Sequence, residues 1–385
     1  ECPTQVDLAT LKSEFMAHYY QEKFRPRQTW AFGLAPWWAH AASVAPRAIN
    51  ALLRAPGTGR LAKWVTGTAP QRVFPNFAPT TFRAWFRRQK PGQGRDVILW
   101  PDTFNNYFAP QTLAAAVEVL AHAGCAVRIP EQSLCCGRPF YDYGFLEHAK
   151  RGWRAILDAL EPDIQAGTPL VGLEPSCVAA FRDELVNLFP DDTRAHRLKA
   201  QTYTLSEWLG ALDGFEVPQL ARRALVHAHC HDEAVLGFDR ALELVERMGL
   251  DVYKPRSGCC GMAGAFGYER GEKYSVSVAA GERVLLPAVR AMADAALIIT
   301  DGFSCRDQIR QATDRTALHL AEAMQLALHA DAFAGDGRRP EQQHAELTPK
   351  GLQVRARGDA KPRAAGWALG AASLGAALWW TLAGL

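Results

Sequence analysis

The chain has 385 residues, of which 48% are hydrophobic and 22% charged. This length and composition predict a globular protein of two to three domains and exclude disordered, collagen-like and polytopic membrane proteins. The nine cysteines are an odd number with two adjacent pairs, a pattern that disfavours a disulfide framework and favours metal-binding thiolates in a reducing compartment.

The net charge of +3 is unevenly distributed along the chain. Residues 1–95 carry 14 Lys or Arg and four Asp or Glu, whereas the remaining 290 residues carry 29 and 36. The basic N-terminal part is therefore expected to face an acidic partner subunit or an anionic surface. We expect no nucleic acid partner, because no nucleic-acid-binding motif accompanies this charge.

The chain begins with Glu1-Cys2-Pro3, followed by apolar residues whose spacing predicts a helix over residues 4–22. A Cys-Pro pair is typical of the last ligand of a bacterial ferredoxin run, so residues 1–22 are interpreted as the tail of a ferredoxin-like module with Cys2 as a candidate iron ligand. The alternative is a lone surface cysteine, because this chain carries none of the upstream cysteines of such a run.

Residues 23–95 form a basic segment rich in Pro, Trp and Arg. Short helices are expected there over residues 47–54 and 60–66, joined by Pro and Gly turns.

Residues 96–330 alternate between apolar runs and helical patterns. Apolar strands between helices predict an α/β fold whose parallel sheets are flanked by helices. The expected strands cover residues 97–100, 126–129, 170–173, 224–229 and 296–300. The expected helices cover residues 111–123, 145–160, 177–188, 204–212, 238–248, 270–292 and 315–328.

This region also contains an internal repeat, whose pattern includes seven of the nine cysteines and predicts two similar lobes. In the second copy, residues 216–330, Cys230 precedes Cys259 by 29 residues, and Cys260 precedes Cys305 by 45. Because three of the expected strands end just before a cysteine, and ligands collect at the carboxyl ends of parallel strands, these cysteines are expected to converge.

The first copy, residues 96–215, is a degenerate version of the same pattern. The cysteines that follow the repeated pattern are Cys135, Cys136 and Cys177, and Asp102 or Thr103 stands where the second copy has its leading cysteine. We therefore interpret these three cysteines as weaker candidates for a metal site.

A Cys-Cys-Gly turn suits an inorganic cofactor. Two adjacent thiolates on a tight turn reach one centre, and the glycine, Gly261 in the second copy, permits a positive φ and close backbone approach. Soft thiolates favour iron–sulfur or zinc, and zinc sites usually contain Cys-x2–4-Cys pairs, which this sequence lacks. The predicted ligands are Cys230, Cys259, Cys260 and Cys305; the alternative is that they are buried small hydrophobic residues.

Both copies resemble the cysteine-rich CCG domain, which occurs twice in one of the subunits of heterodisulfide reductase and in the iron–sulfur subunit of glycolate oxidase. Leu134-Cys135-Cys136-Gly137-Arg138-Pro139 and Asp301-Gly302-Phe303-Ser304-Cys305-Arg306 are similar to the C-terminal half of fused FAD-linked oxidases of the D-lactate and D-2-hydroxyglutarate dehydrogenase type. The resemblance covers about residues 1–330. It implies an iron–sulfur cluster, of the 4Fe-4S type, in this chain and FAD on a partner or on an upstream domain.

The sequence departs from the fullest family pattern, which ends in Cys-x-x-Cys. Gly302 and Glu174 stand three residues before Cys305 and Cys177. The second copy keeps four cysteines, enough for one ordinary cluster. The first keeps three, to which Asp102 or Glu174 would add a carboxylate.

Three histidines surround the leading cysteine of the second copy. Alternate residues of a strand share a face, so His227, His229 and His231 are expected to line one side. They are interpreted mainly as hydrogen-bonded neighbours of the cluster, with metal ligation or proton transfer as alternatives. Cys125 is expected in the core.

The C-terminal region is predicted to be a linker followed by an apolar helix. Residues 331–365 are polar and rich in Gly, Pro and Arg, as in flexible linkers. Residues 366–385 carry no charge and have Trp near both ends, and 20 helical residues span about 30 Å, the hydrocarbon thickness of a bilayer. We interpret them as a single-pass anchor that holds the body on the cytoplasmic face of the membrane, with a packed or dangling apolar helix as the alternative.

The resemblance implies an electron-transfer component of an FAD-linked 2-hydroxy-acid dehydrogenase, acting on a substrate such as D-lactate, 2-hydroxyglutarate or glycolate. It would pass electrons from the flavin to a quinone or cytochrome. The alternatives are a thiol–disulfide reductase like heterodisulfide reductase and a non-redox assembly module with degenerate metal sites.

Overall fold

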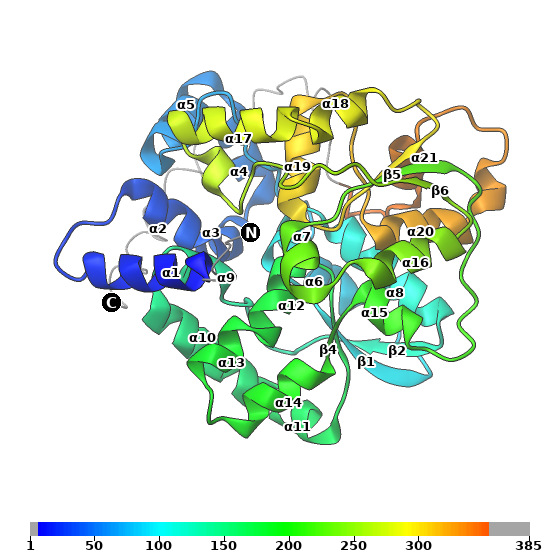
Figure 1. Cartoon of the computed structure of the whole chain (residues 1–385), viewed down its shortest axis with the longest axis horizontal. Coiled ribbons are helices and arrows are strands. Elements are labelled where there is room, and N and C mark those ends of the chain that lie inside the picture. The colour runs from blue at the N-terminus through cyan, green and yellow to red at the C-terminus, as the bar shows by residue number, and fades with distance from the viewer. Residues whose placement is uncertain (1–6, 354–385) are drawn as a thin grey trace.

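The computed structural model describes residues 7–353. Its N-terminal part is helical, and helices begin there at prolines or at a capping side chain. Asp7 accepts hydrogen bonds from the N–H groups of Ala9 and Thr10, and prolines stand in the first turns of three of the helices. The helices are α1 (Leu8–Tyr19), α2 (Arg27–Gly33), α3 (Ala35–Ala42), α4 (Pro46–Arg54), α5 (Pro56–Thr66) and α6 (Phe82–Phe86). They include the three helices expected from the sequence. Helices α1 to α5 lie together at one side of the molecule, whereas α6 lies near its middle, against α7 and α8 of the first lobe (Figure 1).

The first lobe contains a four-stranded parallel sheet of order β2-β1-β3-β4. Its strands are β1 (Arg95–Trp100), β2 (Cys125–Arg128), β3 (Leu170–Gly172) and β4 (Thr202–Thr204). The helices are α7 (Thr103–Tyr107), α8 (Pro110–His122), α9 (Arg138–Asp142), α10 (Leu146–Ala159), α11 (Glu161–Ala166), α12 (Pro175–Arg182), α13 (Glu184–Leu188), α14 (Thr193–Gln201) and α15 (Leu205–Gly210).

The second lobe contains a three-stranded parallel sheet of order β6-β5-β7. Its strands are β5 (Arg223–Val226), β6 (Asp251–Tyr253) and β7 (Leu297–Ile299). The helices are α16 (Asp239–Arg247), α17 (Glu272–Glu282), α18 (Leu285–Arg290), α19 (Phe303–Ala312), α20 (Leu320–Leu328) and α21 (Pro340–Leu347), with short helical turns at Asp232–Leu236, Phe266–Tyr268 and Ala330–Phe333.

Both lobes use the same topology, which agrees with the repeat in the sequence. The first strand of each lobe is central, with the second strand on one side and the third on the other. The central strands are buried on both faces, which explains their continuous apolar sequence. β4 and β6 were not expected from the sequence; β6 is a short edge strand that is largely exposed and therefore lacks an apolar pattern.

The lobes share one hydrophobic core. Leu99 and Leu113 of the first lobe belong to the same cluster of buried residues as Leu244, Leu297 and Met324 of the second. In addition, α20 of the second lobe packs on α8 of the first.

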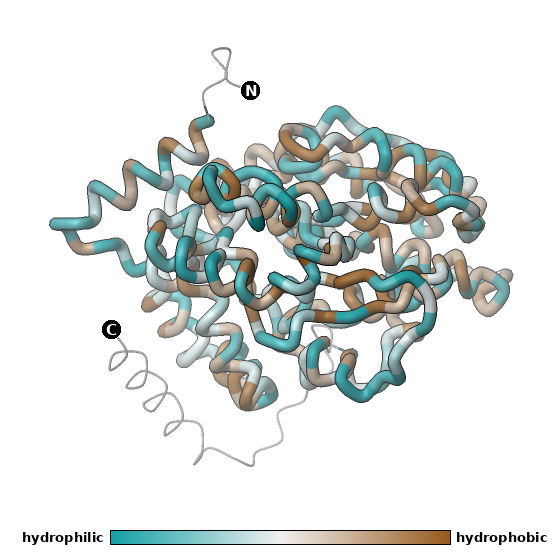
Figure 2. The backbone as a smooth tube through the Cα atoms, turned by 90° about the horizontal axis from the view of Figure 1, so that it is seen from below, coloured by the Kyte–Doolittle hydropathy of each residue, from teal (hydrophilic) through white to brown (hydrophobic). Residues whose placement is uncertain are grey.

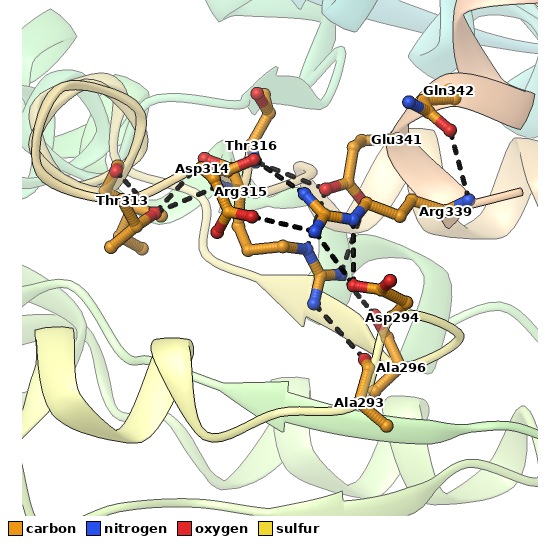
Figure 3. A network of polar contacts seen from close by, with 11 residues as sticks. Ala293, Asp294, Ala296, Thr313, Asp314, Arg315, Thr316, Arg339, Glu341 and Gln342 are labelled. Carbon is orange, nitrogen blue, oxygen red and sulfur yellow. Dashed lines mark hydrogen bonds and ion pairs between the residues drawn. The ribbon is translucent and has the colours of Figure 1, made fainter.

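Residues 331–353, which were expected to begin a flexible linker, are folded against the second lobe. Arg315 Nε donates to Glu341 Oε1 of α21 at 2.8 Å, and Arg339 pairs with Asp294 and Asp314 at 2.9 and 2.8 Å (Figure 3). The prediction was wrong because charged residues of this polar stretch, Arg339 and Glu341, find partners of opposite charge that lie far from them in the sequence.

The remaining linker residues, the apolar segment 366–385 and Cys2 lie outside the described residues. Between residues 7 and 353, no helix is both long and apolar enough to cross a bilayer.

Candidate functional site

The four predicted ligands of the second lobe lie on three segments that follow the three strands of its sheet. Cys230 lies beyond β5, the Cys259-Cys260 pair lies in the loop after β6, and Cys305 lies in the first turn of α19, just after β7. The strands are parallel, so their carboxyl ends meet at one edge of the sheet. Residues separated by up to 75 positions are thereby brought to one place.

The structure gathers the sulfur atoms into one cluster. Cys260 Sγ and Cys305 Sγ are 3.2 Å apart, and the thiol of Cys259 is hydrogen-bonded to those of Cys230 and Cys260. All four are free thiols. Cys260 and Cys305 are buried, whereas Cys230 and Cys259 are exposed, so the cluster has a closed inner side and an open outer side.

The electrostatics of this cluster suit a cation. Hydrogen bonds from Cys230 and Cys260 lower the pKa of Cys259 to about 2, and a hydrogen bond from Cys260 lowers the pKa of Cys305. The pKa values of the donors Cys230 and Cys260 are raised, mainly by these same hydrogen bonds to their neighbours. A bound metal ion would displace the thiol protons, because metals bind the thiolate form of cysteine.

The Cys-Cys-Gly turn is held in a conformation that glycine favours. Gly261 has φ 92°, its N–H donates to Cys259 Sγ at 3.3 Å, and a Cβ at this position would overlap the carbonyl oxygen of Ser277 in α17. Gln308 of α19 donates from Nε2 to the carbonyl oxygens of Cys260 and Ser277 at 3.1 and 3.2 Å. Helices α17 and α19 thus fix the turn from two sides.

The first lobe repeats this arrangement with fewer sulfurs. Cys177 Sγ of α12 lies 2.8 Å from Cys136 Sγ, and Cys135 is hydrogen-bonded to Cys136 and to the hydroxyl of Thr103. Burial raises the pKa of Cys177 to about 12. The first site therefore contains three thiols and a hydroxyl that occupies the place of the leading cysteine.

Asp102 and Glu174, the two carboxylates proposed from the sequence as ligands of this first site, accept hydrogen bonds from other residues of the protein. Asp102 is fully buried and accepts hydrogen bonds from the backbone N–H and the Nδ2 of Asn105, at 2.9 and 2.7 Å. Burial and the charge of Glu174 raise the pKa of Asp102 to about 6. Glu174 accepts from Ser176 Oγ at 3.0 Å and from Phe303 N at 2.8 Å.

The histidines near Cys230 do not all share one side, contrary to the expectation. The rings of His229 and His231 stack with centroids 5.1 Å apart, whereas His227 Nδ1 is bound to Ser257 Oγ at 2.8 Å. The alternation fails because β5 ends at Val226, before all three. Burial, and then the charge of Arg138, lower the pKa of His231 to about 2.

His229 also occupies the place of the cysteine that is missing at Gly302. A Cβ at Gly302 would lie within 3.2 Å of three atoms of the His229 ring. This histidine was expected mainly as a hydrogen-bonded neighbour of the cluster, with metal ligation or proton transfer as alternatives, and the sequence did not predict its contact with Gly302.

The two sites are connected across the lobes. Glu174, in the first site, accepts the N–H of Phe303 at the start of the helix that carries Cys305. Arg306, which follows Cys305, donates to Asn105 Oδ1 at 2.7 Å and to Thr112 Oγ1 at 3.0 Å in the first lobe. These hydrogen bonds fix the position of the Cys305 helix relative to the first lobe.

Comparison with known proteins finds one domain twice in this chain. The cysteine-rich CCG domain matches the chain twice, over residues 103–182 and 224–310. The chain is 27% identical over 265 residues to a subunit of the anaerobic glycerol-3-phosphate dehydrogenase of Escherichia coli, covering 67% of this chain and 66% of that protein. It is 26% identical over 349 residues to the D-2-hydroxyglutarate dehydrogenase of Pseudomonas putida, covering 84% of this chain but 32% of that enzyme.

A third relative is matched over most of its own length. The lactate utilization protein A of Geobacillus kaustophilus is 32% identical over 187 residues, which cover 46% of this chain and 75% of that protein. With two matched domains and this relative, the chain belongs to the cysteine-rich CCG domain family.

Proposed function

We propose that the protein is an iron–sulfur electron carrier of a dehydrogenase. The observation that carries this proposal is the gathering of four free thiols from three loops into one cluster in the second lobe. Four soft sulfur donors in one cluster fit an iron–sulfur cluster, of the 4Fe-4S type. Cys230, Cys259, Cys260 and Cys305 would hold it, and Cys135, Cys136 and Cys177 would form a weaker second site.

The residues around the thiols have separate tasks in this proposal. When bound, the cluster supplies reversible one-electron transfer. The N–H of Gly261 stabilises charge on the Cys259 sulfur, which tunes the potential of the centre. Buried Cys260 and Cys305 keep water from the inner side, while exposed Cys230 and Cys259 leave an edge at which a redox partner can approach.

The partners follow from the relatives, which are named as dehydrogenases of glycerol-3-phosphate and D-2-hydroxyglutarate and as a lactate utilization protein. We propose that electrons come from the flavin of an FAD-containing dehydrogenase subunit or domain that oxidises a 2-hydroxy acid. They would leave to a quinone or cytochrome. The chain matches 66% of the E. coli relative and 32% of the Pseudomonas enzyme, so the carbon chemistry is assigned to the partner or domain.

We further propose that helices α1 to α5 dock on an anionic membrane surface. Of the 15 large hydrophobic side chains that are exposed in the described residues, 12 lie between Leu8 and Val65. Figure 2 shows hydrophobic residues along helix α1 at the edge of the molecule. No Asp or Glu occurs from residue 23 to residue 95. Exposed tryptophans with arginines and lysines are typical of membrane interfaces, and residues 366–385 would add a second anchor.

The central test is anaerobic reconstitution of the chain with iron and sulfide, followed by metal analysis and EPR. We expect about four irons and four sulfides per chain at the second site, and loss of most of this signal in Cys260→Ser. Cys125→Ala is the matched control, because Cys125 is equally buried but belongs to the hydrophobic core. A full signal in Cys260→Ser would refute the assignment.

A second measurement separates the proposed function from its closest alternative. The reconstituted chain should be reduced by an FAD-containing 2-hydroxy-acid dehydrogenase and reoxidised by a quinone analogue. Reduction of a disulfide by the chain alone, without a flavoprotein, would instead indicate a thiol–disulfide reductase.

A further inference from the structure

His227 lies beside the buried side of the second cluster of thiols. One of its ring nitrogens is within 4.8 Å of the sulfurs of Cys260 and Cys305, and the ring is hydrogen-bonded to the Cys305 sulfur. His227 is only 2% exposed and Cys305 only 1%. Because water does not compete for the sulfur on this side, a hydrogen bond to it acts in surroundings of low polarity, where its electrostatic effect is large.

Ser257 determines which ring nitrogen is left for the sulfur. Ser257 Oγ lies 2.8 Å from His227 Nδ1, so Nε2 is the nitrogen available to Cys305. When the serine hydroxyl donates to Nδ1, the proton of the neutral imidazole is on Nε2 and is donated to the sulfur. Ser257 stands two residues before Cys259. A chain of two hydrogen bonds therefore runs from the loop that carries the Cys-Cys-Gly turn, through the imidazole, to the first turn of α19.

The backbone holds the imidazole in this place. The N–H of His227 donates to the carbonyl oxygen of Ile299 at 2.9 Å, which continues the pairing of β5 with β7 beyond Val226. Ile299 is the last residue of β7, and Cys305 lies in the first turn of the helix that follows. The donor and the sulfur are thus both fixed to the end of one strand, so the hydrogen bond is in place before a cluster binds.

We propose that Ser257 and His227 form a hydrogen-bond chain to Cys305 that raises the reduction potential of the iron–sulfur cluster in the second lobe. The inference rests on the proposed iron–sulfur function and names two residues that the cysteine pattern does not include. Reduction adds negative charge to the cluster and its thiolates, and a donor at the Cys305 sulfur stabilises that charge. Ser257 is a positioning residue, because it acts on the sulfur through His227.

The test is a redox titration of the reconstituted full chain, followed by EPR. We expect His227→Phe, which has no donor, to lower the reduction potential at an unchanged content of iron and sulfide. His227→Gln keeps an N–H at a similar reach and should restore most of the potential. Ser257→Ala should lower it by a smaller amount. The matched control is His344→Phe: His344 is a buried histidine of α21 that is bound to Gln325 Oε1, and its substitution should leave the potential unchanged.

The outcomes distinguish this inference from the proposed function. A wild-type potential in His227→Phe with full iron, or an equal fall in His227→Gln or in His344→Phe, overturns the hydrogen-bond chain alone. If His227→Phe holds no iron, Ser257→Ala decides, because it removes a single oxygen atom: an unchanged potential, or loss of iron in this variant as well, shows that the two residues are structural and overturns the inference. Absence of iron and sulfide from the reconstituted wild-type chain overturns both.

Discussion

Arg72 is a buried cation that connects the N-terminal segment to the turn that carries Cys259 and Cys260. Its guanidinium donates to Gly267 O at 2.8 Å, to Gln308 Oε1 at 2.7 Å and to Ser277 Oγ at 3.0 Å. Gln308 in turn donates to the carbonyl oxygen of Cys260. One side chain thus satisfies buried acceptors on three segments around the site.

We expect Arg72→Met to lower the free energy of unfolding by about 3 kcal/mol, because it leaves several buried acceptors without donors. Urea denaturation of the metal-free chain measures the change. Arg87→Met is the control: Arg87 is an exposed residue of the same segment, and its substitution should change the stability by less than about 0.5 kcal/mol. Equal stability losses in the two variants would show that the buried network is not stabilising.

The Cys-Cys-Gly turns are the elements that repeat most closely between the lobes. The carbonyl of the second cysteine is held in each lobe, by Trp153 Nε1 at 2.6 Å for Cys136 and by Gln308 Nε2 at 3.1 Å for Cys260. The glycines also agree: Gly137 has φ 83° and Gly261 has φ 92°. The same backbone geometry is therefore supported by different side chains.

Gly261→Ala should destabilise the chain by about 2 kcal/mol and reduce the iron bound at the second site, because alanine is strained at positive φ and its Cβ meets the Ser277 carbonyl. Thermal unfolding and iron analysis measure both effects. Gly152→Ala is the control: Gly152 lies in helix α10 with no atom near its would-be Cβ, so the change should be neutral or stabilise by up to about 1 kcal/mol. Normal iron binding in Gly261→Ala would contradict the role given to the turn.

At the scale of the whole molecule, charge and exposed apolar surface are concentrated on the N-terminal helices. We expect the full chain to bind vesicles that contain phosphatidylglycerol more tightly than neutral phosphatidylcholine vesicles. In the double variant Arg47→Glu/Arg60→Glu, the difference in binding free energy between anionic and neutral vesicles should fall by about 2 kcal/mol, because each basic residue near an anionic membrane contributes about 1 kcal/mol. Vesicle co-sedimentation measures the affinity for each vesicle type. Because insertion of the C-terminal segment would contribute to both affinities, their ratio removes that contribution.

The matched control for membrane binding is Arg240→Glu/Arg247→Glu, which makes the same charge change at exposed positions of α16 in the second lobe. It should leave the preference for anionic vesicles unchanged. If both double variants lose the preference for anionic vesicles equally, the net charge of the protein rather than its N-terminal surface determines binding.

The sequence by itself determined the α/β class, the repeat and the set of cysteines that meet. These follow from local information: apolar runs predict the buried strands, and parallel strands bring the residues after them to one edge. The expected strands at residues 97–100 and 170–173 coincide with β1 and β3. The sequence also placed Cys125 in the core.

Only the tertiary structure decided which groups lie beside the thiols and whether the polar stretch from residue 331 packs on the second lobe. The stretch from residue 331, expected to be a linker, is held on the second lobe by the pair of Arg315 and Glu341, which are 26 residues apart. Asp102, a candidate metal ligand from the sequence, accepts a hydrogen bond from the side chain of Asn105 instead. His227 and His229 are equivalent in the sequence, but Nδ1 of His227 is hydrogen-bonded to Ser257 Oγ, whereas Nδ1 of His229 accepts the backbone N–H of His231. Hydrogen-bond partners depend on distances across the folded chain, and these distances are set by packing rather than by local periodicity.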